Sequence, residues 1–363
     1  MKKLPIELNN QINGECWTFY KLSILLSSPI AKPWLATHME FYINENLCGG
    51  YSNADCEYYH MRYFQDIFDI HKIPVIKTAP ESIVKKIIAE LDMDNYVVIY
   101  LNFSRFYGID NNVSLHELMI YGYDEDGGVF YTPYLVNGKF QEAKISFDLL
   151  EAAYKDAYLQ YLQNGWSLLG KRTFFFGITS IHVRDDYKND NWFADYINKI
   201  DHEIHGRKIV QTQMVYDITE PRICYTGLAC YCILSEIFME KGSKDGFNEK
   251  MTENLIRTLK MLHDHKALFA WSVEWFINQV GGQNNSELVK VLADYNDYTT
   301  ELERCCLLLC KYDQTKKSEL LISISKVLQK QLKNELETLL NYRKQIWPYY
   351  YADNGVPMPP DDD

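Results

Sequence analysis

Residues 11–26 read QINGECWTFYKLSILL, and this stretch decides how the first half of the chain is interpreted. Asn13 and Gly14 are turn-forming residues, and an apolar helix is predicted to begin at Cys16. A thiol at a helix N-terminus meets free backbone N–H groups and a partial positive charge, which favour the thiolate. Gln11 can turn its side-chain amide toward an acyl oxygen at that sulfur and, with the backbone N–H of Cys16, form an oxyanion hole. The stretch therefore predicts a nucleophilic cysteine.

A second stretch, residues 116–133, reads HELMIYGYDEDGGVFYTP. His116 begins a predicted strand, and Asp126-Gly127 is a pair that favours a tight hairpin turn. We expect the returning strand to end at Thr132 and to bring its hydroxyl close to His116. A hydroxyl there can hydrogen-bond to one imidazole nitrogen and leave the other nitrogen to act as a base. The pattern therefore predicts a catalytic histidine oriented by Thr132, with Asp124 as the alternative orienting residue.

Taken in order, these residues resemble the papain-like cysteine peptidase superfamily, in particular its branch of bacteriocin-leader peptidases and related acyltransferases. Members of that branch carry a Gln, then a Cys at a helix start, then a His followed by Gly-Tyr, and then Asp-Pro. The resemblance covers residues 5–180. It implies that Gln11, Cys16, His116 and Thr132 are catalytic and that Trp17 contacts the substrate; the matching positions are Gln11, Cys16-Trp17, His116, Gly122-Tyr123 and Thr132-Pro133.

The chain departs from that branch in ways that change the expected activity. Thr132 stands where the branch has an Asp, and the spacing from Gln11 to Cys16 is one residue shorter. Leader peptidases of the branch are usually fused to transporters, whereas no apolar run here approaches the roughly 18–20 residues of a membrane span. The chain more closely resembles stand-alone papain-like acyltransferases and peptide ligases of thiotemplated biosynthesis, such as the closthioamide type.

This second resemblance implies amide-bond formation in nonribosomal antibiotic biosynthesis. An acyl or peptidyl chain on the phosphopantetheine thioester of a carrier protein passes to Cys16, and a small amine such as a diamine then releases it as an amide. The sequence contains no P-loop and no G-x-G-x-x-G motif, which favours a pre-activated thioester over ATP as the acyl donor. We expect no metal and no cofactor beyond the phosphopantetheine of the donor.

Two other classes of function stay open at this point. A cysteine peptidase or thioesterase would use the same Cys16 and His116, and water would then take the place of the amine. A non-catalytic papain-like scaffold is favoured by Thr132, because a neutral side chain cannot balance an imidazolium. Cys48, which precedes two glycines, is an alternative nucleophile, but no helix clearly follows it.

The composition limits the classes of partner and the cellular compartment that we expect for this protein. The 363 residues carry 37 Lys and Arg against 49 Asp and Glu, a net charge of -12. Nucleic-acid binding depends on clustered cations and is not expected. The nine cysteines form no dense framework, which indicates reduced thiols. With neither a signal-peptide pattern nor a membrane span, we expect a cytoplasmic protein.

The pattern along the chain predicts an α+β fold in two parts. Residues 1–181 mix helical and strand patterns and are expected to form a papain-like domain with an antiparallel sheet. Residues 182–347 are expected to form an all-α bundle, because apolar residues recur there at helical spacing. Residues 348–363, which end in prolines and aspartates, are expected to be a disordered tail.

Overall fold

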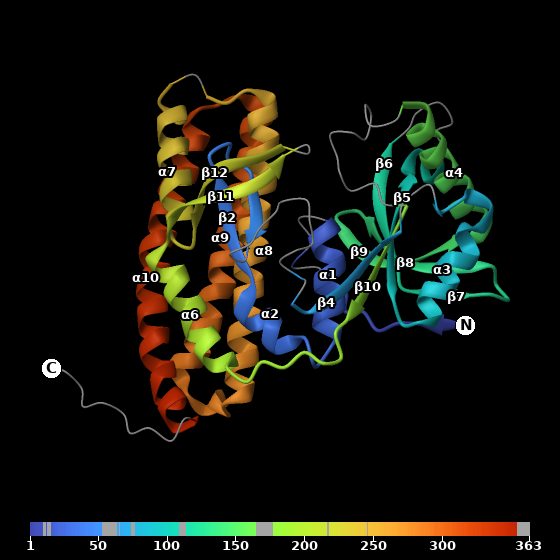
Figure 1. Ribbon diagram of the computed structural model, residues 1–363. Helices are drawn as coiled ribbons and strands as arrows, with labels where there is room; N and C mark the ends of the chain where they lie inside the picture. Colours follow the sequence, from blue (N-terminus) through green and yellow to red (C-terminus); the bar gives the residue numbers. More distant parts are fainter. Residues whose placement is uncertain are drawn as a thin grey trace. The chain divides into compact units, whose positions relative to one another are not determined.

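The computed structural model describes residues 1–9, 12, 16–52, 64, 66–73, 77–108, 114–164, 177–215, 218–244 and 246–353. Helices and antiparallel sheets alternate along the chain, so the expected mixture of helix and antiparallel sheet is confirmed (Figure 1). The chain divides into two compact units. The first is Met1–Lys32, Cys56–Lys188 and Thr212–Glu220, and the second is Pro33–Asp55, Asn189–Gln211 and Pro221–Asp363.

The first unit contains two antiparallel sheets. One has the strand order β4 (Phe68–Ile73), β10 (Ile178–Val183), β5 (Tyr96–Asn102), β6 (Leu115–Ile120). The other has the order β1 (Lys2–Lys3), β7 (Gly122–Asp124), β8 (Val129–Val136), β9 (Lys139–Ser146). The helices are α1 (Cys16–Ser27), α3 (Ile83–Asp92) and α4 (Phe147–Asn164), with short 3-10 turns η3 (Pro80–Ser82) and η4 (Phe103–Tyr107).

The core of this unit follows from simple sequence patterns. β5 reads YVVIYLN and is buried over nearly its whole length, as its continuous apolar run predicts. Helix α3 buries one stripe, Ile83, Ile87 and Leu91, and contacts β5, as does α4. The turn at Asp126-Gly127 is confirmed, because β7 and β8 pair across it. Helix α1 contacts β6, so the predicted cysteine helix lies against the predicted histidine strand.

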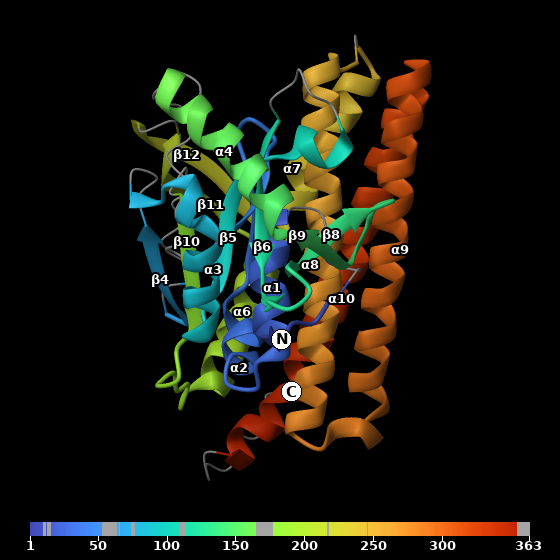
Figure 2. The same cartoon turned by 90° about the vertical axis from the view of Figure 1, so that its right-hand side faces the viewer.

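The second unit combines a sheet with long helices. The sheet has the strand order β11 (Lys208–Val215), β12 (Ile218–Thr226), β2 (Glu40–Asn44), β3 (Gly49–Ser52). The segment Thr212–Glu220, which contains parts of β11 and β12, is assigned to the first unit. Its helices are α2 (Lys32–His38), α6 (Trp192–His205), α7 (Ala229–Gly242), α8 (Glu249–Gln279), α9 (Ser286–Thr315) and α10 (Glu319–Asp353), with a 3-10 turn η5 (Gly282–Asn284). Helices α8, α9 and α10 run side by side (Figures 1 and 2).

Capping residues explain where two of these helices begin. The Asn248 side chain accepts a hydrogen bond from the Met251 N–H at 2.9 Å at the start of α8. Asn285 does the same for the N–H groups of Glu287 and Leu288 at the start of α9. Each side-chain oxygen satisfies N–H groups that have no partner inside the helix. Helices α7 to α10 confirm the helical spacing of apolar residues in this part of the chain.

The structure corrects the predicted division of the chain. Residues 33–55 belong to the second unit, although the prediction placed them in a domain of residues 1–181. The segment 182–347 is not all-α, because β11 and β12 interrupt it; β12 pairs with β2, with Cys224 opposite Asn44. Partners so far apart in sequence leave no periodic signal. Residues 348–353 continue α10 instead of forming a disordered tail, and residues 354–363 lie outside the described part.

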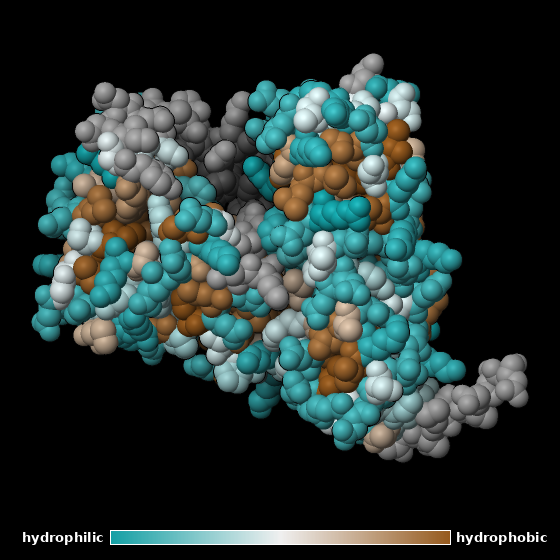
Figure 3. Space-filling model, turned by 180° about the vertical axis from the view of Figure 1, so that it is seen from behind, coloured by the Kyte–Doolittle hydropathy of each residue, from teal (hydrophilic) through white to brown (hydrophobic). Residues whose placement is uncertain are grey.

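The distribution of hydrophobic side chains on the surface and the lengths of the helices are both relevant to contact with a membrane. On the face drawn in Figure 3, hydrophobic side chains lie in separate groups among hydrophilic ones. Among the residues that the structure describes, no helix combines the length and the apolar character needed to cross a bilayer.

Candidate active site

Cys16 is the first residue of α1, as predicted, and its side chain is half-buried. Tyr20 follows Cys16 by four residues, so it lies one turn further along and on the same face of the helix. Its hydroxyl donates to the backbone carbonyl of Glu117 on β6 at 3.3 Å. This bond joins the cysteine helix to the strand that carries His116.

His116 lies on β6 opposite Leu101 of β5 and is 44% exposed at its side chain. Its ring lies beside the ring of Phe103, with centroids 5.1 Å apart. Its Nδ1 lies 3.0 Å from the carbonyl oxygen of Glu117 and 3.4 Å from the Glu117 carboxylate Oε2. A proton on Nδ1 would be donated to that carbonyl, which leaves the lone pair on Nε2 to act as a base.

Thr132 lies on β8 and is fully buried. Its hydroxyl donates to the Pro133 carbonyl at 3.2 Å. The expected hydrogen bond from Thr132 to the imidazole of His116 is therefore not formed. The hairpin register explains the difference. Gly122 pairs with Tyr131, so the next step along β8 brings Thr132 level with Tyr121, well along the chain from His116.

The remaining predicted residues are only partly visible. Gln11 lies outside the described residues, so the structure does not address its predicted place in an oxyanion hole. Trp17 follows Cys16 in α1, and its backbone is helical. The role of Trp17 in substrate binding stays a prediction.

The environment of Tyr20 shows which groups gather at this point. Burial raises the pKa of Tyr20 well above its ordinary value, and the charges of Cys16 and Glu117 raise it further. The Tyr20 hydroxyl and the Nδ1 of His116 both meet the carbonyl oxygen of Glu117, and Cys16 begins the helix that carries Tyr20. We call these four residues the α1–β6 site.

Glu117 and Tyr20 were not predicted as members of this cluster. Strand alternation places the side chains of neighbouring residues on opposite faces, so the sequence pattern does not bring Glu117 to His116. Tyr20 could have been found from its spacing of four residues after Cys16. Nothing in the sequence reveals that its hydroxyl reaches β6.

Two other cysteines among the described residues have surroundings that disfavour a thiolate. Burial raises the pKa of Cys48, which disfavours its thiolate and weakens the case for it as an alternative nucleophile. Burial also raises the pKa of Cys224 to about 12. Among the described residues, no cluster of His, Cys, Asp and Glu is arranged to hold a metal ion.

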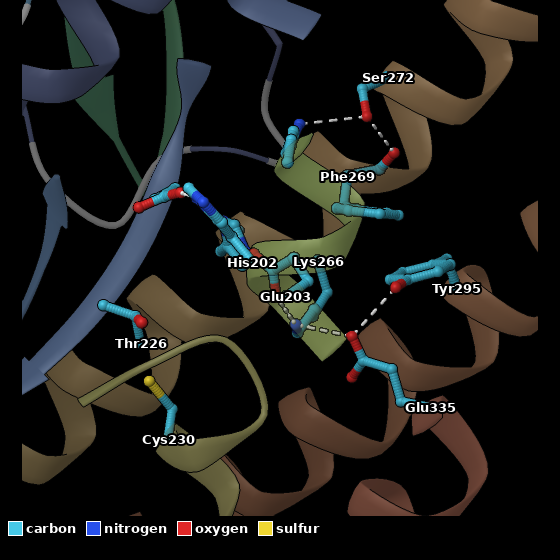
Figure 4. A network of polar contacts seen from close by, with 12 residues as sticks. His202, Glu203, Thr226, Cys230, Lys266, Phe269, Ser272, Tyr295 and Glu335 are labelled. Carbon is cyan, nitrogen blue, oxygen red and sulfur yellow. Dashed lines mark hydrogen bonds and ion pairs between the residues drawn. The ribbon is translucent and has the colours of Figure 1, made fainter. Parts of the chain in front are cut away.

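A second cluster of charges is buried in the core of the second unit (Figure 4). The Lys266 ammonium lies 2.7 Å from a Glu335 carboxylate oxygen and 3.3 Å from Glu203, and all three side chains are at most 2% exposed. His265 lies 2.6 Å from Glu203, and Tyr295 donates to Glu335 at 3.0 Å. We call these residues the core charge cluster.

The charges of this cluster support one another. Burial by itself raises the pKa of Glu203, but Lys266 and His265 outweigh it and hold this pKa below its usual range. Burial lowers the pKa of Lys199, a neighbouring buried lysine, to about 8. Residues of α6, α8, α9 and α10 form the cluster and so join these helices. Their side chains are buried, so a substrate cannot reach them.

Comparison with known proteins assigns this chain to no family. No protein-family model matches this chain, and no curated protein matches it. The assignment of function therefore depends on the residues of the α1–β6 site and their geometry.

Proposed function

We propose that the chain is a cysteine-dependent acyltransferase that forms an amide from a carrier-bound acyl or peptidyl thioester and an amine. The observation that supports this best is the contact of α1 with β6, which carry Cys16 and His116. A thiol at a helix start and an imidazole on the adjoining strand are the groups that acyl transfer through a thioester intermediate requires. In this proposal the first unit is papain-like and α1 is its cysteine-bearing helix.

The first step transfers the acyl group to Cys16. His116 takes the thiol proton, and the Cys16 sulfur attacks the carbonyl carbon of the donor thioester. The bond from that carbon to the phosphopantetheine sulfur breaks, and the departing sulfur receives the proton from His116. The backbone N–H of Cys16 and the side-chain amide of Gln11 are proposed to stabilise the oxyanion between these events.

The second step forms the amide. The amine nitrogen attacks the acyl carbon, and Nε2 of His116 accepts a proton from that nitrogen. The bond from carbon to the Cys16 sulfur breaks, and the sulfur recovers a proton from His116, which returns the site to its starting state. The bond between Nδ1 and the Glu117 carbonyl keeps Nε2 available for both transfers.

The acidic character of the chain supports an amine as acceptor. A net charge of -12 attracts cationic molecules and raises their local concentration. Amide formation also requires that water be kept from the acyl-enzyme, because water would release the free acid. Trp17, next to Cys16, is the residue proposed to line the acyl-binding surface.

A product-partition experiment tests this proposal. The protein is mixed with a short acyl-pantetheine thioester, with and without a diamine, and the amide and the free acid are quantified. We expect the amide to exceed the acid when the diamine is present, and Cys16→Ala to abolish both products while Cys48→Ala leaves them unchanged. Free acid as the main product in the presence of diamine would instead indicate a thioesterase. Full activity in Cys16→Ala would contradict the proposed site.

A further inference from the structure

We infer that Glu117 is the side chain that positions and charge-balances His116, the task that the family pattern gives to an Asp and that Thr132 does not perform here. This inference rests on the proposed pairing of Cys16 with His116. Glu117 acts through the imidazole and does not touch substrate, so it is a positioning residue.

Two oxygen atoms of Glu117 lie close to Nδ1 of His116. The Glu117 Oε2 lies 3.4 Å from Nδ1, and the Glu117 carbonyl oxygen lies 3.0 Å from the same nitrogen. The carbonyl is held in place, because it also accepts the Tyr20 hydroxyl and because Glu117 pairs with Tyr100 of β5. The Glu117 side chain is only 16% exposed, which limits screening of its charge by water.

The neighbouring elements supply no other carboxylate for this role among the described residues. Tyr20 of α1, the helix that begins at Cys16, reaches the Glu117 carbonyl, and Tyr100 of β5 lies opposite Glu117. Tyr134 of β8 stacks on Phe103 beside the imidazole. The tyrosines carry hydroxyls, and the hydroxyl of Thr132 is bound to the Pro133 carbonyl. An anion beside an imidazolium stabilises the charged form, which a neutral hydroxyl does far less. Glu117 therefore removes the main difficulty raised by the missing Asp.

The test compares two isosteric variants, Glu117→Gln and Thr132→Val. The rate at which iodoacetamide alkylates Cys16 is measured from pH 5 to 9 by quantifying the modified Cys16 peptide, so that the other cysteines do not interfere. We expect Glu117→Gln to slow alkylation about fivefold at pH 6.5, because the anion beside Nδ1 is lost, and Thr132→Val to leave the profile unchanged.

A double-mutant cycle separates action through His116 from a direct effect on the thiol. In the His116→Gln background, Glu117→Gln is expected to cause no further slowing, because the imidazole on which Glu117 acts is gone. Equal slowing in both backgrounds, an unshifted profile in Glu117→Gln, or a shift in Thr132→Val alone would each overturn the inference. Alkylation does not require an acyl donor, so a protein that shows this coupling but transfers no acyl group would refute the proposed function and leave the inference standing.

Discussion

The two nitrogens of His116 have different surroundings, and this asymmetry carries the proposed chemistry. Nδ1 faces the Glu117 carbonyl and carboxylate, which leaves Nε2 as the basic nitrogen. Base catalysis by a positioned side chain contributes about 10²–10⁴-fold to a rate. We therefore predict that His116→Ala lowers the rate of amide formation at least about 100-fold, measured as initial product release at pH 7.5. A loss smaller than threefold would show that His116 is not the base.

At the residue scale, the sequence predicted what local patterns can express. The start of a helix at Cys16 and the placement of His116 on a strand follow from turn residues and apolar runs. The hydrogen-bond partner of Thr132 does not follow from such patterns, because it depends on the register between β7 and β8. The contact between Tyr20 and Glu117 depends on how α1 lies against β6, which no local pattern encodes.

At the scale of elements, the core charge cluster ties α8 to α6 and α10. Lys266 of α8 lies between Glu203 of α6 and Glu335 of α10 (Figure 4). Removing it would leave a buried carboxylate without a counter-charge. We predict that Lys266→Met lowers the free energy of unfolding by about 3–5 kcal/mol, measured by urea denaturation.

The matched control for that prediction is Lys290 of α9. It also pairs with a carboxylate, Asp294, at 2.8 Å, but the lysine side chain is 62% exposed. Water screens such a pair, so Lys290→Met is expected to change stability by no more than about 1 kcal/mol. Equal effects of Lys266→Met and Lys290→Met would show that burial does not govern the strength of these pairs.

The elements of the second unit also show where prediction from sequence ends. The long helices were predicted because their apolar residues repeat at helical spacing over many turns. The strands β11 and β12 were missed, and residues 33–55 were assigned to the wrong unit. β11 pairs with its neighbour β12, but the sheet is completed by pairing of β12 with β2, far away in the chain, such as Cys224 with Asn44.

At the scale of the whole molecule, buried titratable groups make stability depend on pH. Burial lowers the pKa of His265 in the folded protein, even though Glu203 opposes this effect. The pKa of Glu203 is also below its usual range, because neighbouring cations outweigh burial. For both groups the unfolded chain binds the proton first as the pH falls. Their stabilisation is thus present above about pH 6.5 for the histidine and about 4.3 for the glutamate, and it is lost on acidification.

This linkage predicts a lower urea midpoint at pH 5 than at pH 7.5. In His265→Gln, whose amide can still donate to Glu203, the fall in midpoint between pH 7 and pH 5.5 is expected to become smaller. An unchanged fall in this variant would assign the acid sensitivity to other groups. A midpoint that rises on acidification would contradict the sign of both pKa shifts.

Intact-protein mass spectrometry after mixing with a short acyl thioester shows whether Cys16 carries the acyl group. We expect one acyl adduct that maps to Cys16, is labile to hydroxylamine and is discharged faster by a diamine than by buffer alone. An adduct on another cysteine, or none on Cys16 even with a donor presented on its carrier protein, would contradict this expectation.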